Sequence, residues 1–344
     1  MLSLLTGLLA GAPVPRINLP NGVAMPAMLL GVGTATWMND TSTASDVKEG
    51  ILAGFPGIDT ASHYLNQRGV AAGIAASGVA RSDLWLSTKV EGCGNSVTIP
   101  VRKGSCYSDT LAVINQNLAE LNTSAVDLTL LHSPPASCSC THGPQGWQCV
   151  ANATWNEGCE GNPASDLIYP THCKCDQPEP CAMIQQQWKA LEVAYKAGHT
   201  RAIGVSNYCA KCLKCVTDVA TVSPHVNMFK VHAGMGPDPA GLISATKATG
   251  AVVQAYQALA HGDHGLFHEP AVLAAAKAHG KSAAQVLIKW VLQLGLPVVT
   301  SATKVAYMKE DLDMWGWQMT SEEMQTLNQL QGHGDDPVGN MCVL

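Results

Sequence analysis

The sequence predicts an α/β fold, a (β/α)8 TIM barrel, on three observations. Strand-like and helix-like segments alternate eight times along most of the chain, which is typical of parallel strands joined by helices. The strand-like segments are almost continuously apolar, as expected for strands buried on both faces. Three consecutive strands also end on an ionisable residue, namely Asp59, Lys89 and His132. Because the carboxyl ends of barrel strands surround one site, we expect these three side chains to meet there.

The expected elements follow one another regularly. A β-hairpin is expected across residues 14–29, ahead of the barrel. The eight strands are expected at residues 29–33, 57–61, 85–90, 126–132, 201–207, 225–230, 251–257 and 297–302. Helical patterns cover residues 45–54, 67–77, 108–121, 184–197, 209–220, 239–249, 270–294 (two helices), 304–312 and 320–331.

One interval breaks this rhythm, between the fourth strand and the helix that follows it. Residues 133–183 are rich in Pro, Gly, Asn, Ser and Cys and show little periodicity, whereas connections in such units usually take about 2–6 residues. We interpret them as a long Cys-rich insertion at the mouth of the barrel. The expected organisation is a short signal-like segment over residues 1–13, a single barrel domain over residues 14–331 that contains the insertion, and a C-terminal tail over residues 332–344.

Charge and composition exclude two classes of partner. The net charge is −6 with only 20 Lys and Arg, and no basic cluster or stripe occurs, so the phosphate neutralisation that nucleic-acid binding needs is missing. No apolar run approaches the ~20 residues of a membrane-spanning helix, so we expect no membrane span. We expect a monomer that acts on a small molecule.

Cysteines are numerous and unevenly distributed. Of the 13, seven fall between Cys138 and Cys181, and three more, Cys209, Cys212 and Cys215, recur at helical spacing. Such density is typical of an oxidising compartment, where disulfides persist, and it favours the secretory pathway or the extracellular space over the cytoplasm. We expect most cysteines of the insertion to be cross-linked, some of them to the helix after the fifth strand.

A further disulfide is expected on the loop after the third strand, where Cys93 and Cys106 would close a small loop. Zinc binding is the alternative, because pairs such as Cys138-Ser-Cys140 stand close to His142. One residue between ligands is less typical of zinc sites than a gap of about 2–4 residues. Disulfides are therefore favoured, we expect no metal, and the connectivity stays open.

Six short motifs stand in a fixed order between about residue 14 and residue 331. They are Gly31-Val-Gly-Thr34 with Trp37, Gly57-Ile-Asp-Thr-Ala-Ser-His-Tyr64, Ser87-Thr-Lys-Val90, Asp127-Leu-Thr-Leu-Leu-His132, Gly204-Val-Ser-Asn-Tyr208 and Ser282-Ala-Ala-Gln-Val-Leu-Ile-Lys-Trp290. In this order the set resembles the aldo-keto reductase superfamily, and only the insertion interrupts the resemblance. It implies an oxidoreductase that reduces an aldehyde or ketone to an alcohol by hydride transfer from NAD(P)H.

The resemblance also implies a catalytic tetrad of Asp59, Tyr64, Lys89 and His132. When hydride reaches a carbonyl carbon, the oxygen gains negative charge and must take a proton, and Tyr64 would be that acid. A phenol titrates near ~10, so the cation of Lys89, held by Asp59, would tune it toward working pH. His132 would orient the carbonyl or share the proton transfer.

The cofactor contacts that the resemblance implies are less complete. Ser206 and Asn207 match the pair that holds the nicotinamide carboxamide, and Tyr256 matches the residue that stacks on the nicotinamide ring. Met228 stands where the family commonly has a Gln. We expect the four residues to form the nicotinamide side of the site.

The larger departure lies after the eighth strand, where family members grip the 2′-phosphate of NADP with a Lys and an Arg. Ser301 and Tyr307 take these two positions, and Lys304 is a nearby cation that would compensate in part. A bidentate contact between Arg and phosphate is difficult to replace with neutral groups. We therefore expect NADP(H) as the cofactor, preferred only weakly, with NAD(H) also usable.

The substrate pocket departs from the family pattern as well. Trp37 is expected as an apolar wall, but Ser133 stands where an aromatic residue commonly follows the catalytic His. An alternative function is therefore kept open, a catalytically weak barrel that acts as a binding or regulatory protein with a Cys-rich recognition cap. The weakened cofactor contacts at Met228, Ser301 and Tyr307 favour this alternative.

Overall fold

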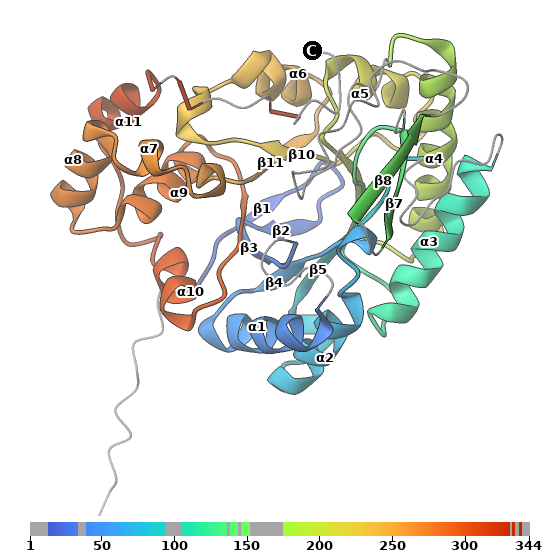
Figure 1. The fold of residues 1–344 in the computed structure, drawn as a ribbon, viewed down its shortest axis with the longest axis horizontal. Helices are drawn as coiled ribbons and strands as arrows, with labels where there is room; N and C mark the ends of the chain where they lie inside the picture. The colour runs from blue at the N-terminus through green and yellow to red at the C-terminus, as the bar shows by residue number, and fades with distance from the viewer. Residues whose placement is uncertain are drawn as a thin grey trace, which may run out of the picture.

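Eight parallel strands close into a barrel in this computed structural model, which describes residues 13–33, 39–93, 105–135, 138–143, 146–151, 175–330, 332–333 and 337–338. Each strand pairs with its neighbour in the ring, and β12 pairs with β3 to close it. Figure 1 shows the helices arranged around this ring. The strands are β3 (Met28–Gly31), β4 (Gly57–Asp59), β5 (Trp85–Val90), β6 (Leu128–Leu131), β9 (Ile203–Ser206), β10 (Val226–Lys230), β11 (Val252–Tyr256) and β12 (Val298–Thr300).

The amino-terminal end of the barrel is covered by the expected hairpin. β1 (Arg16–Asn18) and β2 (Ala24–Pro26) pair antiparallel. Leu19 and Met25 of this hairpin are buried in one cluster with apolar residues from the starts of several strands, among them Trp85. The opposite end of the barrel, at the carboxyl ends of the strands, is left for the site.

Apart from the short helix α7, which was not predicted, the helices occupy the predicted intervals, with boundaries that differ by a few residues. They are α1 (Asp40–Ala53), α2 (Gln67–Ser77), α3 (Cys106–Glu120), α4 (Pro178–Lys196), α5 (Ala210–Thr217), α6 (Leu242–Ala248), α7 (His264–Phe267), α8 (Pro270–His279), α9 (Ala283–Gln293), α10 (Val305–Leu312) and α11 (Ser321–Leu327). α1 begins five residues earlier than expected because the Asn39 side chain accepts a hydrogen bond from the Ser42 N–H, which caps the helix. α4 also begins earlier, with prolines in its first turn, where a missing N–H does no harm.

The insertion contains an element that the sequence does not reveal. β7 (Cys138–Gly143) and β8 (Gly146–Ala151) form a separate two-stranded antiparallel sheet. Of these twelve residues only the backbone is described. Cys138–Gly143, the sequence of β7, is made of small and polar residues without apolar alternation, which explains why periodicity predicts a loop there.

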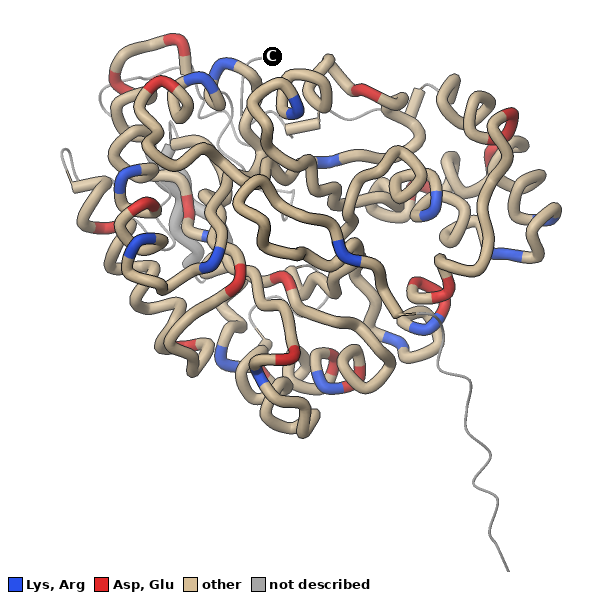
Figure 2. Tube along the Cα trace, turned by 180° about the vertical axis from the view of Figure 1, so that it is seen from behind, with Lys and Arg blue, Asp and Glu red and all other residues tan. Residues whose placement is uncertain are grey.

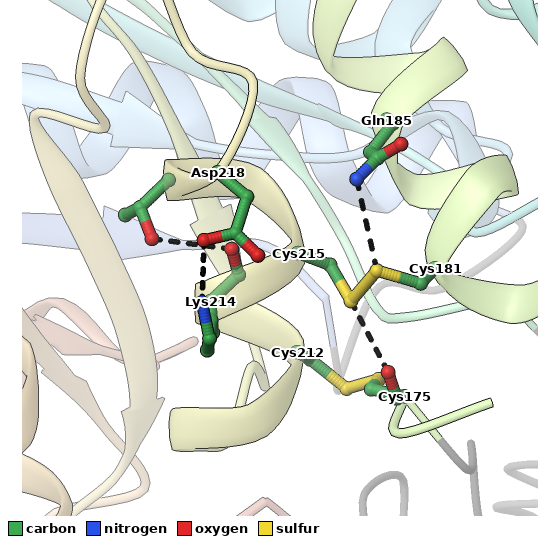
Figure 3. Close-up of a disulfide and its surroundings, with 8 residues drawn as sticks. Cys175, Cys181, Gln185, Cys212, Lys214, Cys215 and Asp218 are labelled. Atoms are coloured by element: carbon green, nitrogen blue, oxygen red, sulfur yellow. Dashed lines mark hydrogen bonds and ion pairs between the residues drawn. A yellow bond between two sulfur atoms is a disulfide. The ribbon is translucent and has the colours of Figure 1, made fainter. Parts of the chain in front are cut away.

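Disulfides tie the end of the insertion to the barrel. Figure 3 shows Cys175 bonded to Cys212 and Cys181 bonded to Cys215, so that α5 holds both the start of α4 and the segment before it. On the other loop, Cys93 is bonded to Cys106 at the start of α3, as predicted. The prediction of disulfides is confirmed for these six cysteines, whose sulfur atoms are therefore not available as zinc ligands.

Charges of both signs are interspersed over the part of the chain that Figure 2 colours, and they form no stripe of one sign in that view. None of the helices described by the structure is long and apolar enough to cross a bilayer.

Candidate active site

A cavity of about 460 Å³ lies at the carboxyl ends of the barrel strands. Its lining residues come from the carboxyl-terminal parts of all eight barrel strands or from the segments that follow them, as Asp59 of β4 and Tyr256 of β11 illustrate. This is the end of the barrel at which parallel strands point their terminal side chains toward a shared centre. The predicted tetrad residues Asp59, Tyr64, Lys89 and His132 all line this one cavity.

A buried ion pair forms the floor of the site. The Lys89 Nζ atom lies 2.5 Å from Asp59 Oδ2 and donates to the Thr60 carbonyl oxygen at 3.0 Å. The second oxygen of Asp59 accepts from the Ser87 hydroxyl at 3.0 Å. Two charges out of water are tolerated only with such partners. The ammonium group is therefore fixed in place.

Tyr64 meets this ammonium group from the short 3-10 helix η1 (Ser62–Tyr64). Its hydroxyl lies 3.3 Å from Lys89 Nζ, and its ring stands edge-on to the His132 ring with centroids 5.5 Å apart. A Cβ atom at Gly33 would lie only 2.4 Å from the Tyr64 ring. A side chain at position 33 would therefore displace the ring, so the glycine is needed for this placement.

The pKa of Tyr64 shifts in the direction opposite to that expected from Lys89 alone. Burial raises the pKa well above its ordinary value, and the charges of Asp59 and Glu91 raise it further. These influences outweigh the neighbouring ammonium group. Tyr64 therefore carries its proton at neutral pH and is present as a hydrogen-bond donor.

Glu91 is a buried carboxylate that the sequence analysis missed. It follows β5 directly, and its Oε1 atom lies 2.7 Å from His132 Nδ1. Burial alone would raise the pKa of Glu91, but the charges of His132 and His63, the hydrogen bond and Lys89 together lower it to about 2. The signal was available, because Glu91 stands two residues after Lys89 at the end of the same strand.

The other wall of the cavity is organised by one amide group. Asn207, with a positive φ of 61°, donates from Nδ2 to the His132 carbonyl oxygen at 2.8 Å and to the Ser206 hydroxyl at 3.1 Å. Its Oδ1 atom accepts from the Tyr256 hydroxyl at 2.7 Å. Asn207 thus links the ends of three strands. Ser206, Met228 and Tyr256 line the cavity beside it.

A loop after β11 also borders the cavity and was not predicted. It contributes Gln257, Ala258, Leu259, His261 and Gly262 to the lining. Three of its non-glycine residues have positive φ angles, and such strained backbone clusters at functional sites. The sequence does not predict this left-handed backbone, because Ala and His at these positions are not residue types that commonly adopt it.

The carboxyl-terminal tail is fastened to this loop region. His333 Nδ1 lies 3.0 Å from Asp263 Oδ2, and His333 Nε2 lies 2.9 Å from Glu269 Oε1. His333 packs against two glycines, because a Cβ atom at Gly234 would lie less than 3 Å from the Cβ atom of His333, and one at Gly265 less than 3 Å from its ring. The hydrogen bond to Glu269 raises the pKa of His333, burial opposes this, and Asp263 raises the pKa further.

The far end of the cavity is neutral. Ser301 and Tyr307 line it, whereas Lys304 is not among the lining residues and holds its ammonium group 5.4 Å from the centre of the Tyr307 ring. Asp311 is buried on α10, and this burial, together with the charge of Glu310, raises its pKa to about 7. No cation lines this end among the residues that the structure describes.

Two predicted substrate-binding residues are not part of the described lining. Trp37 lies outside the described residues. Ser133 is buried next to His132, with its carbonyl oxygen close to Gly92. Both assignments remain predictions.

Comparison with known proteins gives a consistent result. The pattern of the Aldo/keto reductase family matches residues 27–265. Morphine 6-dehydrogenase of Pseudomonas putida is 29% identical over 327 residues, which make up 92% of this chain and 91% of that protein. Glyoxal reductase of Bacillus subtilis (strain 168) is 28% identical over 323 residues, 94% of either chain.

Solved structures agree with the fold. An aldo/keto reductase from Brucella melitensis is similar with a TM-score of 0.71 at 24% identity, covering 92% of this chain and 99% of the other. A Bombyx mori aldo-keto reductase in complex with NADP has a TM-score of 0.70 at 22% identity, covering 94% and 95%. Because the family pattern spans most of the barrel, the chain belongs to the aldo/keto reductase family and is an NAD(P)H-dependent oxidoreductase.

Proposed function

We propose that this protein reduces a small aldehyde or ketone to the alcohol, with Tyr64 as the general acid. The observation that carries the proposal is the position of Lys89 Nζ, between Asp59 Oδ2 and the Tyr64 hydroxyl in the cavity that His132 also lines. Each of these groups is suited to one part of a carbonyl reduction. Family membership supports the same reaction class.

The cavity residues fit a nicotinamide cofactor. The volume of about 460 Å³ is ordinary for a small-molecule site. The Tyr256 ring, held by Asn207, offers a flat surface for the nicotinamide ring, and the Ser206 hydroxyl offers a hydrogen bond for its carboxamide. Both N–H groups of Asn207 are already committed, so Asn207 serves mainly to hold Tyr256 and the strand ends. When bound, the reduced nicotinamide supplies the hydride.

The protein's own contribution is a proton and a fixed electrostatic environment. Tyr64 is protonated, so its hydroxyl donates to the substrate carbonyl oxygen and gives up the proton as negative charge develops there. The raised pKa of Tyr64 makes the resulting phenolate unfavourable, and the ammonium group of Lys89 at 3.3 Å reduces this cost in part. Asp59 keeps Lys89 in position. His132, on the same wall, orients the substrate.

The cofactor preference follows from the neutral end of the cavity. With Ser301 and Tyr307 where cations would meet a 2′-phosphate, NADP(H) loses charge-assisted hydrogen bonds worth about 1.5–3 kcal/mol each. We therefore propose that NADP(H) is used with only a weak preference over NAD(H).

A titration followed by an assay tests the proposed function. NADPH and NADH are titrated against the protein by intrinsic Trp fluorescence, and a panel of aldehydes and ketones is then assayed by loss of reduced-nucleotide absorbance. We expect saturable binding of both nucleotides and turnover of at least one carbonyl. Binding without turnover of any carbonyl would contradict the enzymatic proposal.

Nucleotide binding without turnover of any carbonyl would favour the alternative, a binding or regulatory protein built on the same barrel. Met228, Ser301 and Tyr307 support this alternative because they leave the cofactor with neutral contacts. The disulfide-tied segment before α4 would then serve recognition rather than substrate enclosure.

A further inference from the structure

The proposed mechanism leaves one buried charge unused, the carboxylate of Glu91 behind His132. Its side chain is 3% exposed, and Oε1 lies 2.7 Å from His132 Nδ1. The second oxygen, Oε2, lies 3.8 Å from His63 Nδ1. Burying an isolated carboxylate is strongly unfavourable. We therefore ask what Glu91 does for His132.

The backbone around Glu91 is rigidly held. Gln187 of α4 donates to the Glu91 carbonyl oxygen at 2.9 Å and accepts from the Cys93 N–H at 3.0 Å. Cys93 is in turn bonded to Cys106. Gly92 packs so closely on the chain after β6 that an added Cβ atom would lie 2.3 Å from the Pro134 carbonyl oxygen. The carboxylate is therefore preorganised toward His132.

The charge state of Glu91 decides which ring nitrogen of His132 carries the proton. An ionised carboxylate only accepts hydrogen bonds, so His132 Nδ1 must be the donor. Burial lowers the pKa of His132, Lys89 and His63 lower it further, and the neighbouring Glu91 opposes this. Tyr64 is the remaining titratable group that faces the ring. His132 is thus neutral near neutral pH, and its Nε2 atom has no proton.

We infer that Glu91 is a positioning residue that holds His132 with its proton on Nδ1, so that Nε2 accepts a hydrogen bond in the cavity and favours carbonyl substrates with a hydroxyl on the neighbouring carbon. The inference rests on the proposed function and refines its substrate class. The carbonyl oxygen of such a substrate accepts from Tyr64 while its hydroxyl donates to Nε2. Among the residues described by the structure, none donates a hydrogen bond to Nε2.

A carbonyl compound without that hydroxyl meets a different environment. Its oxygen faces the lone pair of Nε2, which is unfavourable, and His132 helps it only after gaining a second proton. The two substrate types therefore have opposite pH dependences. As the pH falls through the pKa of His132, kcat/KM should rise for the simple carbonyl and fall for the hydroxylated one.

The tautomer itself is tested on the wild-type protein without any substrate. Nitrogen NMR of histidine-labelled protein distinguishes protonated from bare ring nitrogens, and His132→Asn assigns the signal. Near neutral pH we expect Nδ1 protonated and Nε2 bare. A protonated Nε2 in the neutral ring would overturn the inference whatever the protein's activity.

Specificity is tested with matched carbonyls, acetoin against butanone and lactaldehyde against propanal. We expect the hydroxylated member of each pair to have a kcat/KM at least about tenfold higher near neutral pH, the size of one hydrogen bond. In Glu91→Gln the amide can turn its N–H group toward Nδ1, which moves the ring proton to Nε2. The ratio should then fall by about tenfold, and the Nε2 signal should become that of a protonated nitrogen.

Glu192→Gln is the matched control, because Glu192 is another buried glutamate that accepts from the Thr221 and Val222 N–H groups at 2.6 and 2.8 Å. We expect a lower Tm in this variant but an unchanged substrate ratio and an unchanged His132 signal. An equal loss in both variants would assign Glu91 a structural role only. If no carbonyl is turned over, the proposed function fails, and the nitrogen spectrum still decides whether Glu91 sets the tautomer.

Discussion

The two ends of the cavity differ in how firmly their chemistry is specified. At the tetrad end, the Lys89 ammonium group has three partners within 3.3 Å, and every polar group of Asn207 is hydrogen-bonded. At the end bordered by α10, Ser301 and Tyr307 are neutral. Under the proposed function, the difference means that the proton donor and its partners are preorganised, whereas discrimination between cofactors rests on few contacts. Substitutions should therefore be most damaging at the first end and most easily improved at the second.

The largest expected effect is that of Tyr64→Phe. Removing the hydroxyl removes the proton donor, and general acid catalysis is worth about 10²–10⁴-fold. We expect a loss of carbonyl reduction of that size with the dissociation constant for NADPH changed less than about twofold. Steady-state kinetics and a fluorescence titration measure the two quantities. Tyr107→Phe, on the exposed face of α3, is the matched control and should leave both turnover and NADPH affinity unchanged. Retained turnover in Tyr64→Phe would refute the assignment of Tyr64 as the general acid.

Lys89→Met should impair both turnover and folding. The substitution leaves the Asp59 carboxylate buried without its partner, which destabilises a protein by about 3–5 kcal/mol. Thermal unfolding measures this loss. The double variant Asp59→Asn with Lys89→Met should recover most of the stability but none of the activity, because no cation then offsets the Tyr64 phenolate. Recovery of activity in the double variant would show that the ion pair serves folding alone.

Asp311→Asn tests the neutral end through the pH dependence of stability. Burial raises the pKa of Asp311 from 3.8 to about 7, so its protonated form favours the folded state at low pH, and that stabilisation is lost between about pH 4 and pH 7. At about 1.4 kcal/mol per pKa unit, up to about 4 kcal/mol is involved. We expect the Tm of the variant to exceed that of the wild type above pH 7 and the difference to vanish toward pH 4. A difference independent of pH would contradict the raised pKa.

The smallest expected effect is a gain, from Ser301→Lys combined with Tyr307→Arg. Each new cation would add a charge-assisted contact to a 2′-phosphate, and about 1.4 kcal/mol is tenfold in affinity. We expect the ratio of dissociation constants for NADH and NADPH to rise by about a hundredfold, measured by fluorescence titration. Lys304→Met is the control and should change the wild-type ratio little. A wild-type NADPH affinity already a hundredfold above that for NADH, lost in Lys304→Met, would show that Lys304 contacts the phosphate.

The barrel could be predicted from the sequence because its strands are short, apolar and regularly spaced. β5, for example, runs over Trp85–Val90 as the pattern predicts. That Asp59, Lys89 and His132 meet followed from the rule that residues at the carboxyl ends of barrel strands surround one site, whereas Tyr64 and the roles of all four came from the resemblance to the family. Cysteines were informative where both partners lie in one connection, as Cys93 and Cys106 do between β5 and the start of α3. The disulfide partners of Cys212 and Cys215 could not be predicted, because connectivity depends on how the insertion folds.

What the sequence did not reveal depends on contacts between distant residues. Glu91 can be identified as part of the site only from its contact with the side chain of His132, 41 positions later. The loop after β11 depends on left-handed backbone at Gln257 and His261. Gln and His do not by themselves predict that conformation. The direction of the Tyr64 pKa shift required the extent of its burial, which no local pattern provides.

The contact made by His333 has a consequence for how the chain can be shortened. Two carboxylates both accept hydrogen bonds from its ring, so both bonds exist only while the ring carries two protons, and alkaline pH must release one of them. A protein truncated before residue 333 would leave Asp263 and Glu269 without this shared cation, directly beside the loop that borders the cavity. Trimming the tail to aid crystallisation would therefore alter the charge balance directly beside the cavity.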